Sequence, residues 1–194
     1  MKQIIEIEVP DGLKAIWKDG TIKYVPNKPH WKEITIFQDA LYYVHNYLPD
    51  CGDLIDSYNN TIPGSFEYNV VCYRIVVAAL TNNEKRSLTA GDKWYPIVKF
   101  CRPKDKNNCQ GNALIGTIES EGVKYSVMGG YAGYGSDAGL GAFHSNLGVS
   151  YSFTYFGFQS VSSKEIAEHI STYFGRLLFE VHYGGTNCDW KWVG

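Results

Sequence analysis

One strand-to-helix passage near the C-terminus constrains the fold more than any other feature of this sequence. Residues 149–155 alternate apolar and polar side chains, which is typical of a strand with one buried face. Residues 166–181 then repeat apolar side chains at helical spacing and predict one amphipathic helix. Ser162 and Glu165 form a capping box at its start, and Gly184-Gly185 supplies its end. A one-faced strand beside a one-faced helix predicts that the helix packs on a sheet.

Further segments show either the helical spacing or the strand alternation of apolar residues, and they extend this prediction to an α+β fold. Apolar residues at helical spacing predict helices over residues 37–48 and 66–80. A period of two returns in residues 94–101, and again in residues 112–119 and 123–128, which flank a Gly-containing turn and predict a hairpin. We expect an antiparallel β-sheet packed against two or three α-helices.

Four local signals refine these boundaries. Thr35 and Gln38 form a capping box before the helix that Pro49 ends. Pro96 predicts an edge position for its strand, because proline cannot donate to a neighbouring strand. The polar stretch over residues 50–65 is predicted to be a loop. The tail over residues 188–193 alternates and predicts a short docked strand.

The N-terminal residues predict a separate small β-structure. The dipeptides Asp11-Gly12 and Asp19-Gly20 lie between the β-prone runs 3–9, 13–17 and 21–25. Such dipeptides favour tight hairpin turns, because both central positions need positive φ. We therefore expect a three-stranded β-meander over residues 1–26, followed by an α+β domain over residues 30–194. The alternative is one continuous domain over residues 1–194.

Composition excludes some classes of protein and leaves others open. The chain has 194 residues, 44% of them apolar, and a formal net charge of −2, which suits a globular protein and disfavours nucleic-acid binding. Glu6 and Glu8 interrupt the N-terminal apolar run, so we expect no signal peptide, no membrane span and a cytoplasmic location, or one within a particle. The five cysteines lack zinc-site spacing, and either remain reduced or include a Cys101–Cys109 bridge.

The segment over residues 129–148 is rich in glycine and aromatic residues and carries the best candidate contacts. It resembles a nucleotide-binding loop, but its glycines lack the dinucleotide spacing and no Gly-Lys-Ser/Thr follows. Two interpretations remain, a structural loop or a contact loop for a protein, carbohydrate or other small molecule. The contact candidates are Tyr131, Tyr134, Phe143 and His144.

For the other residues with metal-binding or catalytic side chains, the sequence favours ordinary structural roles. The aspartates at 50, 53 and 56 supply three carboxylates but lack the EF-hand order, so a solvated acidic turn is favoured over a calcium site. Glu165 and His169 lie one helical turn apart, and an exposed surface pair is favoured over acid–base work. Cys188 and His182 are near in sequence, which alone says little about a catalytic pair.

Three stretches of the chain carry a resemblance to known sequences. They are the opening Met1–Gly20 sequence MKQIIEIEVPDGLKAIWKDG, Lys93-Trp94-Tyr95-Pro96, and Phe156–Ser160 continuing to Lys164–Glu168. In these stretches the chain resembles a set of proteins of unknown function from phages and prophages of gut Bacteroides. The resemblance implies a mobile-element origin and a modular N-terminus. It implies no activity and no catalytic residues.

These observations together favour a non-enzymatic binding or structural and assembly protein, without cofactor or metal and capable of forming a homo-oligomer. The alternative is an enzyme whose site lies around His144, Asp137 or Cys101. A weaker alternative is single-stranded nucleic-acid binding through stacked tyrosines, against which the acidic balance speaks.

Overall fold

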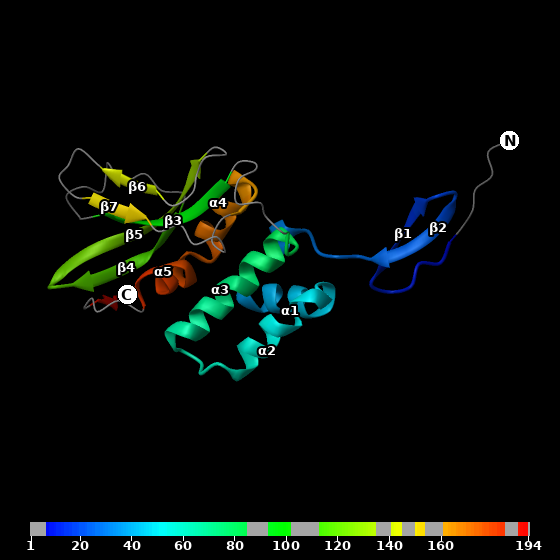
Figure 1. Cartoon of the computed structure of the whole chain (residues 1–194), viewed down its shortest axis with the longest axis horizontal. Coiled ribbons are helices and arrows are strands. Elements are labelled where there is room, and N and C mark those ends of the chain that lie inside the picture. The colour runs from blue at the N-terminus through cyan, green and yellow to red at the C-terminus, as the bar shows by residue number, and fades with distance from the viewer. Residues whose placement is uncertain are drawn as a thin grey trace.

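The computed structural model describes residues 7–84, 93–101, 113–134, 141–144, 150–153, 161–184 and 190–193, and within them it has the predicted α+β class (Figure 1). The strands are β1 (Leu13–Lys18), β2 (Thr21–Pro26), β3 (Lys93–Cys101), β4 (Ala113–Ser120), β5 (Val123–Tyr134), β6 (Gly141–His144), β7 (Ser150–Phe153) and β8 (Lys191–Trp192). The helices are η1 (Trp31–Glu33), α1 (Phe37–Tyr47), η2 (Pro49–Cys51), α2 (Gly52–Asn60), α3 (Phe66–Thr81), α4 (Lys164–Tyr173) and α5 (Gly175–Tyr183). Within these ranges, no helix combines the length and the apolar character that a membrane crossing needs.

The larger sheet is antiparallel and has the order β3-β5-β4-β8. The strand β3, which contains Pro96, lies at an edge of the sheet as predicted. The tail strand β8 docks at the other edge, where Ile118 of β4 lies opposite Trp192. A backbone bridge between Trp94 and Val161 ties β3 to the residues that lead into α4. The pair β6–β7 forms a sheet of its own.

The helices form layers on one side of the larger sheet (Figure 1). α4 and α5 pack against β3, β4 and β5, and α3 packs against both α5 and α1. The main core lies between these helices, with fully buried side chains such as Tyr73, Ile75 and Leu178. Val127, Ile118 and Phe179 form a second cluster where α5 meets the sheet. Burial of each large apolar side chain contributes roughly 1.5–3 kcal/mol, so this helix-covered sheet carries the stability of the fold.

Two glycines set how closely the helices approach the sheet. A Cβ atom at Gly129 of β5 would overlap the backbone carbonyl of Ser171 in α4. A Cβ atom at Gly175 would collide with the side chain of Ile115 in β4. Gly129 opens the glycine-rich segment of the sequence, and its role is therefore close packing of a strand on a helix.

The C-terminal helix differs from the single helix that its periodicity predicts. It is divided into α4 and α5 at Phe174, which leaves the helical region at φ −117° and ψ 17°. The glycine that follows has low helix propensity and allows the close contact with β4. The cap is also shifted by one residue, because the hydroxyl of Ser163, not of Ser162, accepts the backbone N–H of Ile166 at 3.2 Å. A one-residue shift of this kind cannot be read from two adjacent serines.

Two further predictions in the N-terminal half are wrong. Residues 50–65 were expected to be a loop, yet η2 and α2 occupy most of them, because Leu54, Ile55 and Tyr58 pack on the core at helical spacing. The capping box at Thr35 does not form, since α1 begins one residue later with Ile36 as its N-cap and without a side-chain cap. The helices predicted over residues 37–48 and 66–80 are confirmed as α1 and α3.

The N-terminal sheet has two strands, β1 and β2, and a third is not confirmed. Of the run expected to form the third strand, residues 7–9 are not part of a strand and the rest lies outside the described residues. The predicted turn between β1 and β2 is confirmed, because Asp19 and Gly20 both have positive φ, 54° and 74°. Figure 1 shows this hairpin at one end of the molecule, apart from the helices and the larger sheet.

Candidate functional site

The four contact candidates of the glycine-rich segment lie on strands of two different sheets. Tyr131 and Tyr134 belong to β5, where their register partners are Pro96 and Lys93 of β3. Phe143 and His144 belong to β6, opposite residues of β7. The described parts of the segment are therefore strands and not a loop. The side chains of these four residues lie outside the described part of the structure, so their role as contacts stays a prediction.

Several cysteine and aspartate hypotheses also fall outside the described residues. Asp137, Cys109 and Cys188 are not described, so neither the Cys101–Cys109 bridge nor the Cys188–His182 pair can be placed. Cys101 itself ends β3, opposite Ser126 of β5. The two cysteines described in full, Cys51 and Cys72, are buried free thiols. Burial raises the pKa of the Cys72 thiol to about 11, which disfavours a thiolate nucleophile at neutral pH.

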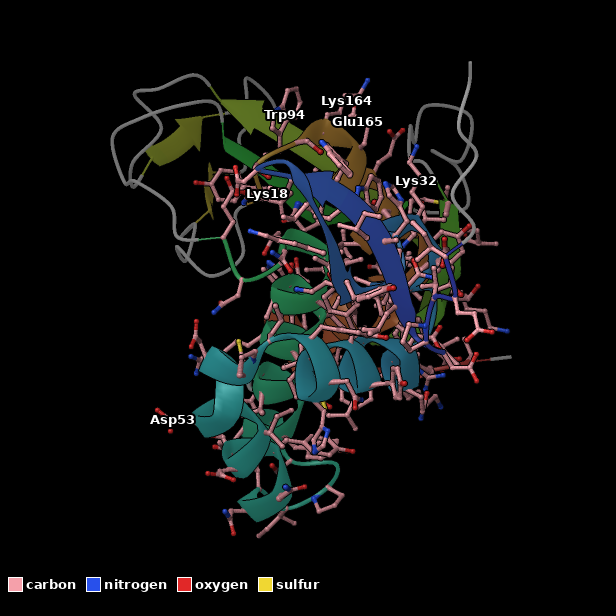
Figure 2. All side chains as sticks on the ribbon, turned by 90° about the vertical axis from the view of Figure 1, so that its right-hand side faces the viewer. Lys18, Lys32, Asp53, Trp94, Lys164 and Glu165 are labelled. Atoms are coloured by element: carbon pink, nitrogen blue, oxygen red, sulfur yellow. The ribbon has the colours of Figure 1, made fainter. Side chains whose placement is uncertain are left out.

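The three aspartates suggested as calcium ligands are exposed on η2 and α2. Asp53 projects outward from α2, as Figure 2 shows. Across the described ranges, no group of three or more His, Cys, Asp or Glu side chains is arranged to hold a metal ion. Asp53 and Asp56 lie on the exposed face of α2, whose other face packs on the core, and Asp50 is exposed on η2.

Glu165 and His169 were expected to form an exposed pair, and for the histidine this is wrong. His169 is buried, and its Nε2 atom lies 2.8 Å from the backbone oxygen of Ile34, so that nitrogen carries the proton and donates. The rings of Trp31 and Tyr173 flank it, with centroids at 5.2 Å and 4.6 Å. Burial lowers the pKa of His169, because the charged form loses its hydration.

Glu165 points away from this environment, at the exposed start of α4 beside Lys164 (Figure 2). Hydrogen bonds from its own backbone N–H and then from the Ser163 side chain lower the pKa of its carboxyl group. Such a carboxylate lies in the first turn of α4, where a negative charge is favourable beside the free backbone N–H groups. Glu165 and His169 are therefore two separate structural groups, one at the exposed first turn of α4 and one joining α4 to the segment before α1.

The β1–β2 hairpin, which the sequence predicted as part of a small N-terminal β-structure, has two chemically distinct faces. Its register pairs Trp17 with Ile22 and Ala15 with Tyr24. Since directly opposed residues share a face and side chains alternate along a strand, one whole face is apolar. We call this the apolar face; its residues are Leu13, Ala15, Trp17, Ile22 and Tyr24.

The opposite face of the hairpin carries its lysines. The register pairs Lys14 with Val25, Ile16 with Lys23 and Lys18 with Thr21. We call this the lysine face. Lys23 also contacts the Asp19 carboxylate of the turn at 3.3 Å, an exposed pair of small energetic value. All the formal charge of the two strands thus lies on one side, and Lys18 marks the turn end of the hairpin in Figure 2.

The apolar face is not covered by the body of its own chain. Trp17 is 72% exposed and Tyr24 is 45% exposed. None of residues 7–25 is buried, and among the described residues β1 and β2 make extensive contacts only with each other. The tyrosine hydroxyl donates to the backbone oxygen of Glu8 at 3.1 Å, so the segment before β1 folds back beside β2. A two-stranded hairpin without a core is marginal in water and gains stability only from a further packing partner.

The link between hairpin and body is held at Lys28. Its Nζ atom donates to the backbone oxygen of Tyr47 at 3.1 Å and to the Oδ1 atom of Asn82 at 3.3 Å. The same ammonium lies 5.9 Å from the ring of Tyr43 and 6.0 Å from the ring of Tyr47. This anchor joins the chain to the ends of α1 and α3 immediately after β2. The hairpin therefore projects from a defined point of the body.

Part of this pattern was visible in the sequence, since Lys14 and Lys18 lie on the same set of alternate positions of β1 and Lys23 lies between Ile22 and Tyr24. What was missing was the register that the Asp19-Gly20 turn imposes, which brings the two apolar sets together on one face. The exposure of the apolar face could be read only from the tertiary structure, because a strand pattern alone predicts a half-buried strand.

Comparison with protein-family models, with curated proteins and with solved structures finds no match to this chain.

Proposed function

We propose that this chain is a non-enzymatic binding or assembly protein that uses the β1–β2 hairpin as its contact module. The observation that carries the proposal is the apolar face, which holds a largely exposed Trp17 on a hairpin without a core of its own. Exposed apolar surface grouped on one face is typical of interaction sites, whereas single exposed apolar residues are ordinary.

The composition of the face supports a protein-binding role. Tryptophan and tyrosine are enriched among the residues that contribute most to protein–protein binding, because they bury a large area with few rotatable bonds. Trp17 and Tyr24 lie on one face of two paired strands, so their backbones hold them in fixed positions relative to each other. Covering the face would remove both rings from water and also stabilise the hairpin.

The wider setting comes from the resemblance of the N-terminus to phage and prophage proteins. The opening sequence MKQIIEIEVPDGLKAIWKDG includes all of β1 and its turn. A modular N-terminus on proteins of mobile genetic elements is consistent with a hairpin that docks into an assembly. The contact candidates Tyr131, Tyr134, Phe143 and His144 belong to this proposal as a second surface, for a protein or a small ligand such as a carbohydrate.

The proposal is tested by placing a photo-reactive amino acid, p-benzoylphenylalanine, at position 17 of the full chain. The matched control carries the same group at position 14, on the same strand but on the lysine face. Each protein is irradiated alone and in an extract of the cells that produce it. We expect covalent adducts from position 17 at several times the yield from position 14, because only the apolar face would be covered.

Equal yields from the two positions would contradict the proposal, since they would show random collisions. The absence of any adduct from position 17, in the extract and with the protein alone, would contradict it as well. The mass of an adduct separates a second copy of the chain, which doubles the mass, from a different partner.

A further inference from the structure

We infer that the apolar face of the hairpin is covered by the apolar face of a second copy of this chain. This inference rests on the proposed function, because both require that face to be a docking surface. It goes further by naming the occupant and predicting a homodimer that forms through the hairpins.

The distribution of charge favours a second hairpin as the occupant. The apolar face carries no charged residue, whereas Lys14, Lys18 and Lys23 all lie on the lysine face. When two apolar faces meet, all the lysines of both copies point outward into water and none is desolvated. An acidic partner would instead be attracted to the lysine face and would leave Trp17 exposed. The apolar face therefore suits an uncharged surface, and its own copy in a second chain is one.

Two hairpins packed face to face would form the small core that one hairpin lacks. Two sheets that pack face to face lie about 10 Å apart and enclose their inner side chains. A pair of two-stranded hairpins would give a four-stranded, two-layer unit with Trp17 and Tyr24 of each copy inside. Such a contact is isologous, since the same patch serves both partners, and this is the commonest arrangement in soluble oligomers.

The size of the face sets the strength of the contact. Each strand has six residues, so the face measures about 20 Å by 10 Å at about 3.3 Å per residue and 4.8 Å between strands. Two such faces bury on the order of several hundred Å², which is below the roughly 1,200 Å² of stable protein interfaces. The hairpin contact by itself therefore predicts a reversible dimer whose population rises with concentration.

The inference is tested on the purified full chain by sedimentation equilibrium over a wide concentration series. Two double variants are compared, Trp17→Thr with Tyr24→Thr on the apolar face and Lys14→Thr with Lys18→Thr on the lysine face. Threonine keeps a high strand propensity at each position, so both variants preserve the tendency to form the hairpin. We expect a monomer–dimer equilibrium in the parent, a dimer at least tenfold weaker in the apolar-face variant, and no weakening in the lysine-face variant.

A conservative variant keeps the test decisive if the threonine substitutions disrupt the strands. Trp17→Phe retains a large aromatic ring and should retain association within a few fold of the parent. A dimer that survives in the apolar-face variant would overturn the inference, and so would a dimer that both double variants weaken equally.

The photo-reactive group at position 17 separates this inference from the proposed function. We expect irradiation of the purified protein to give an adduct of twice the chain mass, linked to residues 13–26 of the other copy. If the purified protein stays monomeric at every concentration while the extract gives an adduct of another mass, the homodimer is overturned and the proposed function stands. If neither sample gives an adduct, both are overturned.

Discussion

The hairpins β1–β2 and β4–β5 are made by the same turn chemistry and end in opposite environments. The turn residues Asp19-Gly20 and Glu121-Gly122 all have positive φ, and both turns join antiparallel neighbours. In β5, however, Val127 is fully buried under the helices, whereas no residue from 7 to 25 is buried. The turn sequence therefore makes a hairpin, while a covering layer of helices makes a hairpin part of a core.

The largest effect is expected where β5 meets α4. Gly129→Ala places a methyl group against the backbone carbonyl of Ser171, which cannot rotate away, so strand and helix must separate. We expect a loss of about 2–3 kcal/mol in the free energy of unfolding, measured by urea denaturation. Gly52→Ala is the matched control, since no atom lies within 4 Å of its added Cβ and no loss beyond about 0.5 kcal/mol is expected. Equal losses would refute close packing at Gly129.

A somewhat smaller effect is expected at His169, which joins α4 to the segment after the hairpin. His169→Leu removes the donor to the carbonyl of Ile34 and leaves that buried oxygen without its partner. We expect a loss of about 2 kcal/mol at pH 8, in the range for an unsatisfied buried acceptor. His45→Leu on the exposed surface of α1 is the control and should cost much less.

The same variant tests the pH dependence of stability. Burial lowers the pKa of His169 in the folded protein below the value near 6.5 of the unfolded chain, so the unfolded chain binds more protons in between. The contribution of neutral His169 to the free energy of unfolding is complete above about pH 6.5 and is lost as the pH falls below that value. The unfolding free energy of the parent should therefore decline more steeply from pH 7.5 to 5 than that of His169→Leu. His182, whose pKa burial also lowers, accounts for part of the decline that remains.

An intermediate loss of stability is expected at the start of α4, and it should distinguish two neighbouring serines. Ser163→Ala removes the hydroxyl that accepts the N–H of Ile166 and should cost about 1 kcal/mol. Ser162→Ala should leave stability unchanged, because the exposed Ser162 is not the cap. Thermal unfolding of both variants checks this, and a larger loss for Ser162→Ala would restore the cap that the sequence suggested.

The smallest effect on stability is expected in the hairpin itself. Trp17→Thr removes the largest side chain of the apolar face, yet that side chain contacts no described core. In dilute protein we expect the unfolding of the body, followed by helical circular dichroism, to change by less than about 0.5 kcal/mol. A substantial loss in monomeric protein would mean that the hairpin belongs to the fold of the body and would end the contrast between the two hairpins.

The candidate site could be predicted only in part. The Asp19-Gly20 turn and the two β-prone runs beside it were in the sequence, but such runs predict strands and cannot say what covers their faces. The prediction that His169 is exposed was wrong, because its burial depends on Trp31 and Ile34, which lie far away along the chain. No local pattern carries such a contact. The candidates Tyr131, Tyr134, Phe143 and His144 remain predictions.

The sequence by itself determined the α+β class, the positions of most helices and strands, and the turns of both hairpins, because hydrophobic period and positive-φ residues act over a few neighbours. Only the tertiary structure decided where the C-terminal helix divides, which serine caps it, and that residues 52–60 form a helix. Those features depend on contacts between distant segments, such as Gly175 with Ile115. The tertiary structure also decided that the apolar face of the hairpin stays exposed. Exposure depends on where all other segments pack, and no local sequence pattern encodes that.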